Sequence, residues 1–167
     1  MSNKVEIERK FIIRKPDEDA LSRLNGYTRS EIEQIYLASP VGVTHRIRSR
    51  RYADRTEYTE TVKLRIDKSS ANELESEITE ERFLELSRNI ADGTRPIVKT
   101  RHTFPMGGHV FEIDVYPEWQ STCILEVELS HRDEEIIFPS LISPVREVTG
   151  EKPYSNASMS RVFPPEQ

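Results

Sequence analysis

The feature that most constrains the fold is an alternation of charged and apolar residues in short segments along the chain. In residues 62–66, three aliphatic side chains alternate with two basic ones, and residues 111–115 and 125–129 alternate apolar with acidic side chains. Successive side chains of a β-strand point to opposite faces of a sheet, so each segment is expected to form a strand with one charged and one apolar face. The chain is therefore predicted to be mainly β. Strands are expected over residues 4–13, 32–38, 43–51, 57–66, 72–78, 96–104, 109–116 and 123–130.

The sign of the charge is constant within most of these segments. The segments at 46–48, 63–65 and 99–101 are basic, and those at 75–77, 112–114 and 126–128 are acidic. A solvated outer face usually mixes the two signs because adjacent like charges repel, although a solvated face of a β-sandwich remains the alternative reading. Clustered carboxylates suit Mg²⁺ or Mn²⁺, and clustered Lys and Arg suit phosphate. A closed antiparallel barrel would place both kinds of cluster around one polar interior.

Two helices and one tight turn are expected between the strands. Thr79 is a suitable N-cap for a helix with acidic residues in its first turn, and Gly93 is placed to end it. A shorter helix is predicted from Pro16 to about Leu24. Residues 105–108 read as a hairpin connection, and residues 143–161 as turns and short helical pieces.

Composition limits the class of protein. A length of 167 residues fits one domain, residues 1–167, and the net charge of −5 disfavours duplex nucleic acid as the main partner. Cys123 is the only cysteine, which fits a reducing compartment, and no apolar run is long enough to cross a membrane. We therefore expect a cytoplasmic protein with no membrane partner, either a monomer or a homodimer. Neither a phosphate-binding P-loop sequence nor a zinc-type histidine spacing is present.

The segment Glu6-Ile7-Glu8-Arg9-Lys10 resembles the Glu-x-Glu-x-Lys signature of the CYTH superfamily, the triphosphate tunnel metalloenzymes. The resemblance covers nearly the whole chain and rests on an ordered series of motifs. These motifs are at 34–37, 46–48, 61–63, 75–78, 99–101, 112–114, 126–128, 147–150 and 154–156. The resemblance implies a closed eight-stranded antiparallel β-barrel that forms a charged tunnel, with a few peripheral helices, of the short bacterial single-domain type.

The resemblance also implies the site residues. Implied ligands for Mg²⁺ or Mn²⁺ are Glu6, Glu8, Glu75, Glu77, Asp114, Glu126 and Glu128. Implied phosphate contacts are Lys10, Arg46, Arg48, Lys63, Lys99 and Arg101. We assign catalytic roles to Glu6, Glu8, Lys99 and Arg101. The family usually carries an Arg shortly before the acidic residues of the fifth strand, where this chain has Asn72 and Glu73, so the register of Glu73, Glu75 and Glu77 is left open.

The function expected from this resemblance is metal-dependent hydrolysis of a small triphosphate, most often inorganic tripolyphosphate. An adenylate cyclase of the same fold, or a thiamine or nucleoside triphosphatase, is an alternative. A further alternative is a module that binds polyphosphate without enzymatic activity. The full set of acidic residues argues against such a module, because a pure binder of anions would gain from losing surplus carboxylates.

Overall fold

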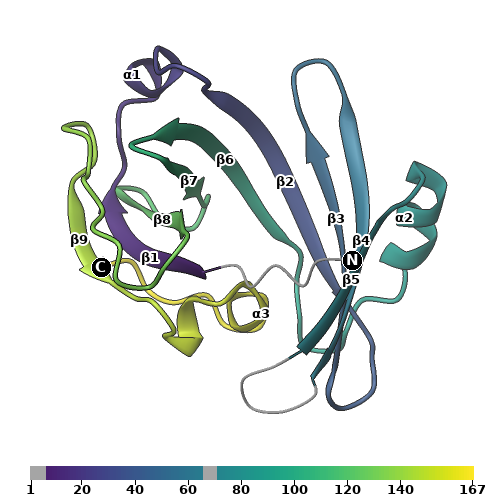
Figure 1. The fold of residues 1–167 in the computed structure, drawn as a ribbon. Coiled ribbons are helices and arrows are strands. Elements are labelled where there is room, and N and C mark those ends of the chain that lie inside the picture. Colours follow the sequence, from purple (N-terminus) through teal and green to yellow (C-terminus); the bar gives the residue numbers. More distant parts are fainter. Residues whose placement is uncertain (1–6, 66–70) are drawn as a thin grey trace. The chain divides into compact units, whose positions relative to one another are not determined.

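A computed structural model describes residues 7–65 and 71–167 (Figure 1). Glu6, predicted to bind metal, lies outside the described residues. The strands are β1 Ile7–Arg14, β2 Thr28–Leu37, β3 Val43–Arg51, β4 Thr56–Arg65, β5 Ala71–Glu77, β6 Ile97–Met106, β7 His109–Val115, β8 Thr122–Leu129 and β9 Pro144–Glu147. The helices are α1 Glu18–Ser22, α2 Glu80–Ser87, α3 Asn156–Met159 and a 3₁₀ turn at Lys152–Tyr154. No helix in the described ranges is long and apolar enough to cross a membrane.

The prediction of a closed eight-stranded barrel that forms a tunnel is wrong. The described strands form one nine-stranded sheet in the order β5-β4-β3-β2-β6-β7-β8-β1-β9, and β5 and β9 are its two edges. The sequence reading missed β9, which pairs antiparallel with β1 from Phe11 opposite Glu147 to Ile13 opposite Pro144. β1 is thereby hydrogen-bonded on both sides, by β8 and by β9, and has no free edge left for closure. The short β9 begins with a proline, which lacks a backbone donor and is tolerated at a sheet edge.

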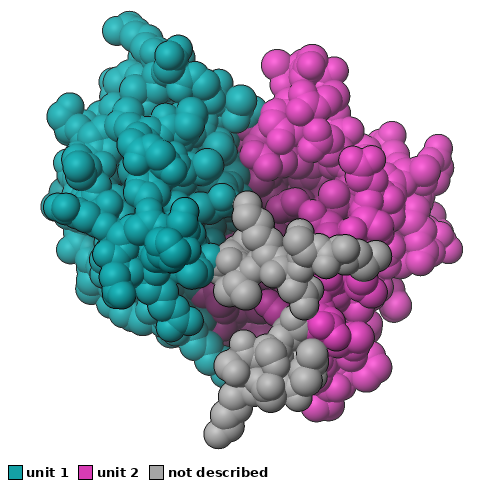
Figure 2. Space-filling model, viewed as in Figure 1, with its two compact units in different colours: residues 1–29, 99–154, 164–167 teal, residues 30–98, 155–163 magenta. Residues whose placement is uncertain are grey.

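The described residues divide into two compact units (Figure 2). Unit 1 consists of residues 1–29, 99–154 and 164–167, and unit 2 of residues 30–98 and 155–163. Unit 1 contains β1, β7, β8, β9 and most of β6, whereas unit 2 contains β3, β4, β5 and most of β2. That residues 1–167 act as a single domain stays a prediction.

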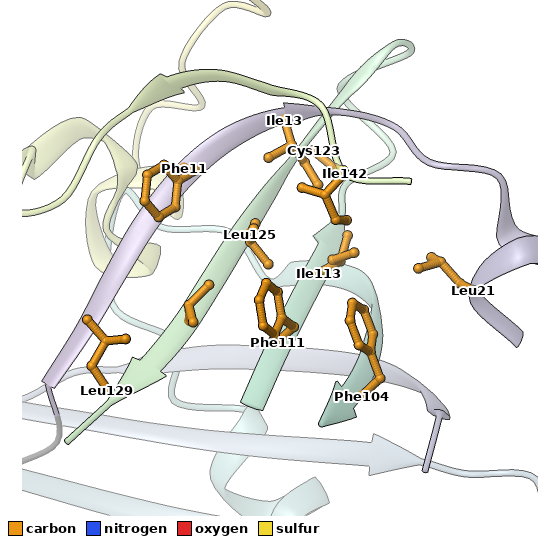
Figure 3. Close-up of a cluster of buried hydrophobic side chains, with 11 residues drawn as sticks. Phe11, Ile13, Leu21, Phe104, Phe111, Ile113, Cys123, Leu125, Leu129 and Ile142 are labelled. Atoms are coloured by element: carbon orange, nitrogen blue, oxygen red, sulfur yellow. The ribbon is translucent and has the colours of Figure 1, made fainter. Parts of the chain in front are cut away.

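Unit 1 has its hydrophobic core on one face of its strands. Alternate residues of β1, β6, β7 and β8 supply most of this core, and Leu21 of α1 joins it (Figure 3). The rings of Phe104 and Phe111, which face each other across the β6–β7 pair, are stacked with centroids 5.3 Å apart. The turn that joins these strands is the predicted hairpin, and both of its glycines, Gly107 and Gly108, have positive φ, as a type I′ turn requires. The alternation of apolar and charged residues that the sequence predicted for these strands is therefore confirmed in unit 1.

Unit 2 buries an apolar face beneath α2. Ile35, Leu37 and Ile47 pack with Phe83 of this helix, as expected from its apolar residues. Thr79 is the predicted N-cap, and its side chain accepts a hydrogen bond from the Arg82 amide at 3.1 Å.

The predicted end of α2 near Gly93 is wrong, because the helix stops at Ser87. The chain leaves the helix to hydrogen-bond with the end of β2: the Ala38 amide donates to Asn89 O, and the Ala91 amide donates to Tyr36 O. Ile90 accordingly forms an isolated bridge with Leu37. Backbone pairing with a strand thus overrides the apolar helical pattern, which continues to residue 91 in the sequence.

Candidate functional site

The face of unit 1 opposite its hydrophobic core carries a cluster of charged side chains, called here the unit 1 charge cluster. Its members are Glu8 and Lys10 of β1, Lys99 and Arg101 of β6, Glu112 and Asp114 of β7, and Glu126 and Glu128 of β8. Strand register brings them together. Glu126 lies between Lys10 and Glu112 on the two neighbouring strands, and Arg101 lies opposite Asp114. Residues opposite each other in antiparallel strands share a face, so the alternation in the sequence directly produces the cluster.

Asp114 is the centre of the cluster and binds two cations. The Lys99 ammonium donates to Asp114 Oδ2 at 2.5 Å, and Arg101 donates from Nε to Oδ1 at 2.7 Å and from Nη2 to Oδ2 at 2.8 Å. The Lys99 and Asp114 side chains are 2% and 1% exposed. Burial alone would raise the pKa of Asp114, but Lys99 and Arg101 lower this pKa well below its usual range. Burial and the neighbouring Arg101 lower the pKa of Lys99, against the opposing effect of Asp114.

The network continues to the neighbouring strands. Arg101 also donates through Nη1 to Glu112 and, at 3.5 Å, through Nη2 to Glu126 Oε2. Lys10 forms an ion pair of 3.0 Å with Glu126 Oε1 and donates to the Tyr154 carbonyl at 3.2 Å. Each of the three cations in this cluster therefore has at least one carboxylate partner, and each is held at a fixed place on the sheet.

The carboxylates of the cluster are crowded. Burial, followed by repulsion from Glu126, raises the pKa of Glu8. Burial also raises the pKa of Glu112, against the opposing effect of Arg101. Excess negative charge of this kind fits a hard divalent cation such as Mg²⁺ or Mn²⁺, which prefers oxygen ligands. Among residues 7–65 and 71–167, however, no three His, Cys, Asp or Glu side chains are arranged closely enough to hold a metal ion.

Unit 2 carries a second set of charges on the face opposite α2. Arg48 and Arg46 of β3 lie 3.9 Å from Glu75 and 3.7 Å from Glu73 of β5, and Lys63 of β4 lies 3.8 Å from Glu73. The register left open by the sequence is settled, because the three acidic residues of β5 lie opposite Lys63, Thr61 and Thr59 and share one face. These pairs are longer and more exposed than those of the unit 1 charge cluster; the Glu73 and Glu75 side chains are each 43% exposed.

The structure distributes the predicted site residues over both units. Glu8, Lys10, Lys99, Arg101, Asp114, Glu126 and Glu128 are in unit 1, and Arg46, Arg48, Lys63, Glu75 and Glu77 are in unit 2. Basic and acidic residues do not form separate surfaces, since within each unit cations and carboxylates of adjacent strands pair with each other, Lys99 with Asp114 and Lys63 with Glu73.

Sequence reasoning left two contributors out of the predicted site. Glu112 precedes Asp114 by two residues, and this spacing alone places it on the charged face. The Tyr154 carbonyl, which accepts from Lys10, has no signal in the sequence.

Fold and site together define a mainly β protein whose antiparallel strands carry one densely charged face. The chain is similar to the inorganic triphosphatase NE1496, with 28% sequence identity, 97% of each chain covered and a TM-score of 0.65. A second crystal structure, of the hypothetical protein NE1496, matches with 28% identity over 96% of this chain and 100% of that chain, at a TM-score of 0.62. PH1819 from Pyrococcus horikoshii OT3 matches with 23% identity over 76% of this chain and 81% of that chain, at a TM-score of 0.51, and shows the fold alone.

The resemblance to the CYTH superfamily, of the short single-domain type, is thereby confirmed by these structural neighbours. A scan against models of protein families gives no match, and a search of curated proteins gives none either.

Proposed function

We propose that this chain hydrolyses a triphosphate in a reaction that depends on a divalent metal, with inorganic tripolyphosphate as its preferred substrate. The observation that carries the proposal is the pair of buried cations, Lys99 and Arg101, held side by side on β6 by Asp114. The likeness to an inorganic triphosphatase over 97% of both chains supports it.

The cations of unit 1 are suited to bind phosphate. Lys10 and Arg101 have carboxylate partners, Glu126 and Glu112, that are less buried than Asp114. In the proposed complex, phosphate oxygens replace these two carboxylates as partners, while Asp114 keeps Lys99 and Arg101 in place. Fixed cations stabilise the charge that spreads over the phosphoryl oxygens in the transition state, and they do so without reorganising.

The acidic residues of unit 1 are suited to hold Mg²⁺ or Mn²⁺. Glu8 and Glu128 lie opposite each other on β1 and β8, and Glu126 is on the same face. We assign the metal to these three carboxylates, whose side chains would have to move closer together to hold it, and to Glu6, which lies outside the described residues. When bound, the metal would neutralise phosphate charge and lower the pKa of a water molecule. Phosphate binding would free Glu126 from Lys10, so that substrate and metal would favour each other's binding.

A substrate panel tests the proposal. Released phosphate is measured from tripolyphosphate, ATP and thiamine triphosphate, each with Mg²⁺, with Mn²⁺ or with excess chelator. We expect metal-dependent release that is fastest with tripolyphosphate. Cyclic AMP and pyrophosphate from ATP, without phosphate release, would instead indicate a cyclase. Tight binding of tripolyphosphate without any turnover would indicate a binding module.

A further inference from the structure

A carboxylate far from the charge cluster in sequence is held by a turn of unit 1. Glu166 accepts hydrogen bonds from three consecutive backbone amides, those of Gln120 at 3.0 Å, Ser121 at 2.6 Å and Thr122 at 2.7 Å. The hydroxyls of Ser121 and Thr122 donate to the same carboxylate, each at 3.0 Å. Five donors to one exposed carboxylate form a charge-assisted clamp on the turn that leads into β8.

The same segment also holds the residue that precedes this turn. Trp119 is 2% exposed, and its indole Nε1 donates to the Pro164 carbonyl at 2.9 Å. Residues 164–166 therefore fix residues 119–122 at both ends, Trp119 by its side chain and the amides of 120–122 through Glu166. A buried tryptophan with a satisfied N–H is a rigid support for its neighbours.

Trp119 connects this clamp to two cations of the charge cluster. Its ring lies against Tyr116, with centroids 6.0 Å apart, and the Lys99 ammonium lies 5.8 Å from the centroid of the Tyr116 ring. On its other side Trp119 lies 6.4 Å from the ring of Tyr154, the residue whose carbonyl accepts from Lys10. Lys99 and Lys10 are thus each supported by a tyrosine that packs on the same tryptophan.

We propose that Glu166 is a positioning residue: by clamping the turn under Trp119, it keeps Lys10 and Lys99 in the places where they bind substrate phosphates. The part of this inference that concerns phosphate rests on the proposed function. The part that concerns the two ammonium groups does not, because their positions can be measured without substrate. Glu166 touches neither lysine and acts only through Trp119, Tyr116 and Tyr154.

The test compares Glu166→Gln with the matched control Glu135→Gln. Glu135 is an exposed residue of unit 1 for which the described structure has no side-chain hydrogen bond or ion pair. Trp119 is the only tryptophan, so its emission reports on the clamp. Labelling of each lysine by acetic anhydride, quantified by mass spectrometry without substrate, reports on the two ammonium groups.

In Glu166→Gln we expect the Trp119 emission to shift to longer wavelength and the labelling of Lys10 and Lys99 to increase several-fold. Labelling of Lys63 in unit 2 should not change. The kcat/KM for tripolyphosphate should fall about tenfold, since small displacements of positioning groups have effects of this order or larger. Glu166→Asp keeps the charge and should partly restore the Trp119 emission and the lysine labelling of the unmodified chain. A loss of general stability would not explain this partial recovery.

Unchanged labelling of Lys10 and Lys99 in Glu166→Gln would overturn the proposal, as would full kcat/KM with increased labelling. If the unmodified chain hydrolyses no triphosphate, the proposed function fails. The labelling then still decides whether Glu166 positions the two lysines.

Discussion

Lys99 and Asp114 form an ion pair of 2.5 Å in which both side chains are almost completely buried. The desolvation cost of such a pair is offset only when every charge has a partner, and Arg101 supplies the second cation that Asp114 requires. The pair is therefore best explained as part of the proposed site. An exchange for apolar residues would remove the desolvation cost, but also the positive charge that we propose to bind phosphate.

Replacing Asp114 by Asn should destabilise the fold strongly. Lys99 would lose its carboxylate partner and Arg101 the most buried of its carboxylate partners, so we expect the free energy of unfolding to fall by about 3–5 kcal/mol. Denaturant unfolding followed by circular dichroism measures this. Glu147→Gln is the control, because its ion pair with Arg9 is 31% and 41% exposed and should contribute only about 0–1 kcal/mol. A loss below 1 kcal/mol for Asp114→Asn would contradict the account.

Replacing Glu8 by Gln should abolish turnover and leave the fold intact. Its raised pKa indicates that the folded protein disfavours the ionised form, so the neutral amide should not destabilise the fold. We expect the free energy of unfolding at pH 7 to stay within about 0.5 kcal/mol of the original or to rise. Phosphate release from tripolyphosphate and calorimetric Mn²⁺ binding give the second readout. Retained activity would remove Glu8 from the metal assignment.

Replacing Arg48 by Ala should affect substrate binding more than stability. Its ion pair with Glu75 is 3.9 Å long and partly exposed, so the free energy of unfolding should change by less than about 1 kcal/mol. If Arg48 contacts phosphate, as the resemblance implies, the loss of one charge-assisted hydrogen bond should raise KM for tripolyphosphate about tenfold. Arg55→Ala is the matched control, because Arg55 pairs with Asp54 and Glu57 and stacks on the Tyr52 ring at the β3–β4 turn. Equal KM values for the two variants would argue against a phosphate contact at Arg48.

The contribution of Glu166 should depend on pH in a defined direction. Hydrogen bonds from the backbone amides of Gln120 and Ser121 lower the pKa of Glu166 from 4.5 to about 2. A lowered acid pKa stabilises the fold above the unfolded value, and this stabilisation is lost as the pH falls through the folded value. The difference in unfolding free energy between the original chain and Glu166→Gln should therefore be constant above about pH 5 and vanish towards pH 2. Unfolding curves from Trp119 emission measure it, and a difference that does not depend on pH would contradict the clamp.

The strands of the charged face could be predicted from the sequence because charged and apolar residues alternate along them. This period of two is typical of a β-strand with one buried face. The charged residues of β1, β6, β7 and β8 could thus be assigned to one face of each strand from their spacing alone. Glu112 belonged to this set by its spacing from Asp114, although it was not assigned a role.

What the sequence could not predict depends on long-range pairing. β9 is four residues long, and its pairing with β1 joins segments more than 130 residues apart, so the local pattern gives no sign that the sheet ends there. The pairing of Arg101 with Asp114 was missed for a related reason. The sign of the charges within one strand does not indicate which strand lies beside it in the sheet, or the sign of that strand's charges. The clamp of Glu166 depends on backbone amides, which any residue except proline can present.

The most direct test of the central claim is the initial rate of phosphate release from tripolyphosphate as Mn²⁺ is titrated into the metal-free chain. The account predicts a rate that rises to saturation with Mn²⁺, returns to background with excess chelator, and is absent in Glu8→Gln at every metal concentration. A rate that does not depend on metal, or equal saturating rates in the original chain and Glu8→Gln, would contradict it.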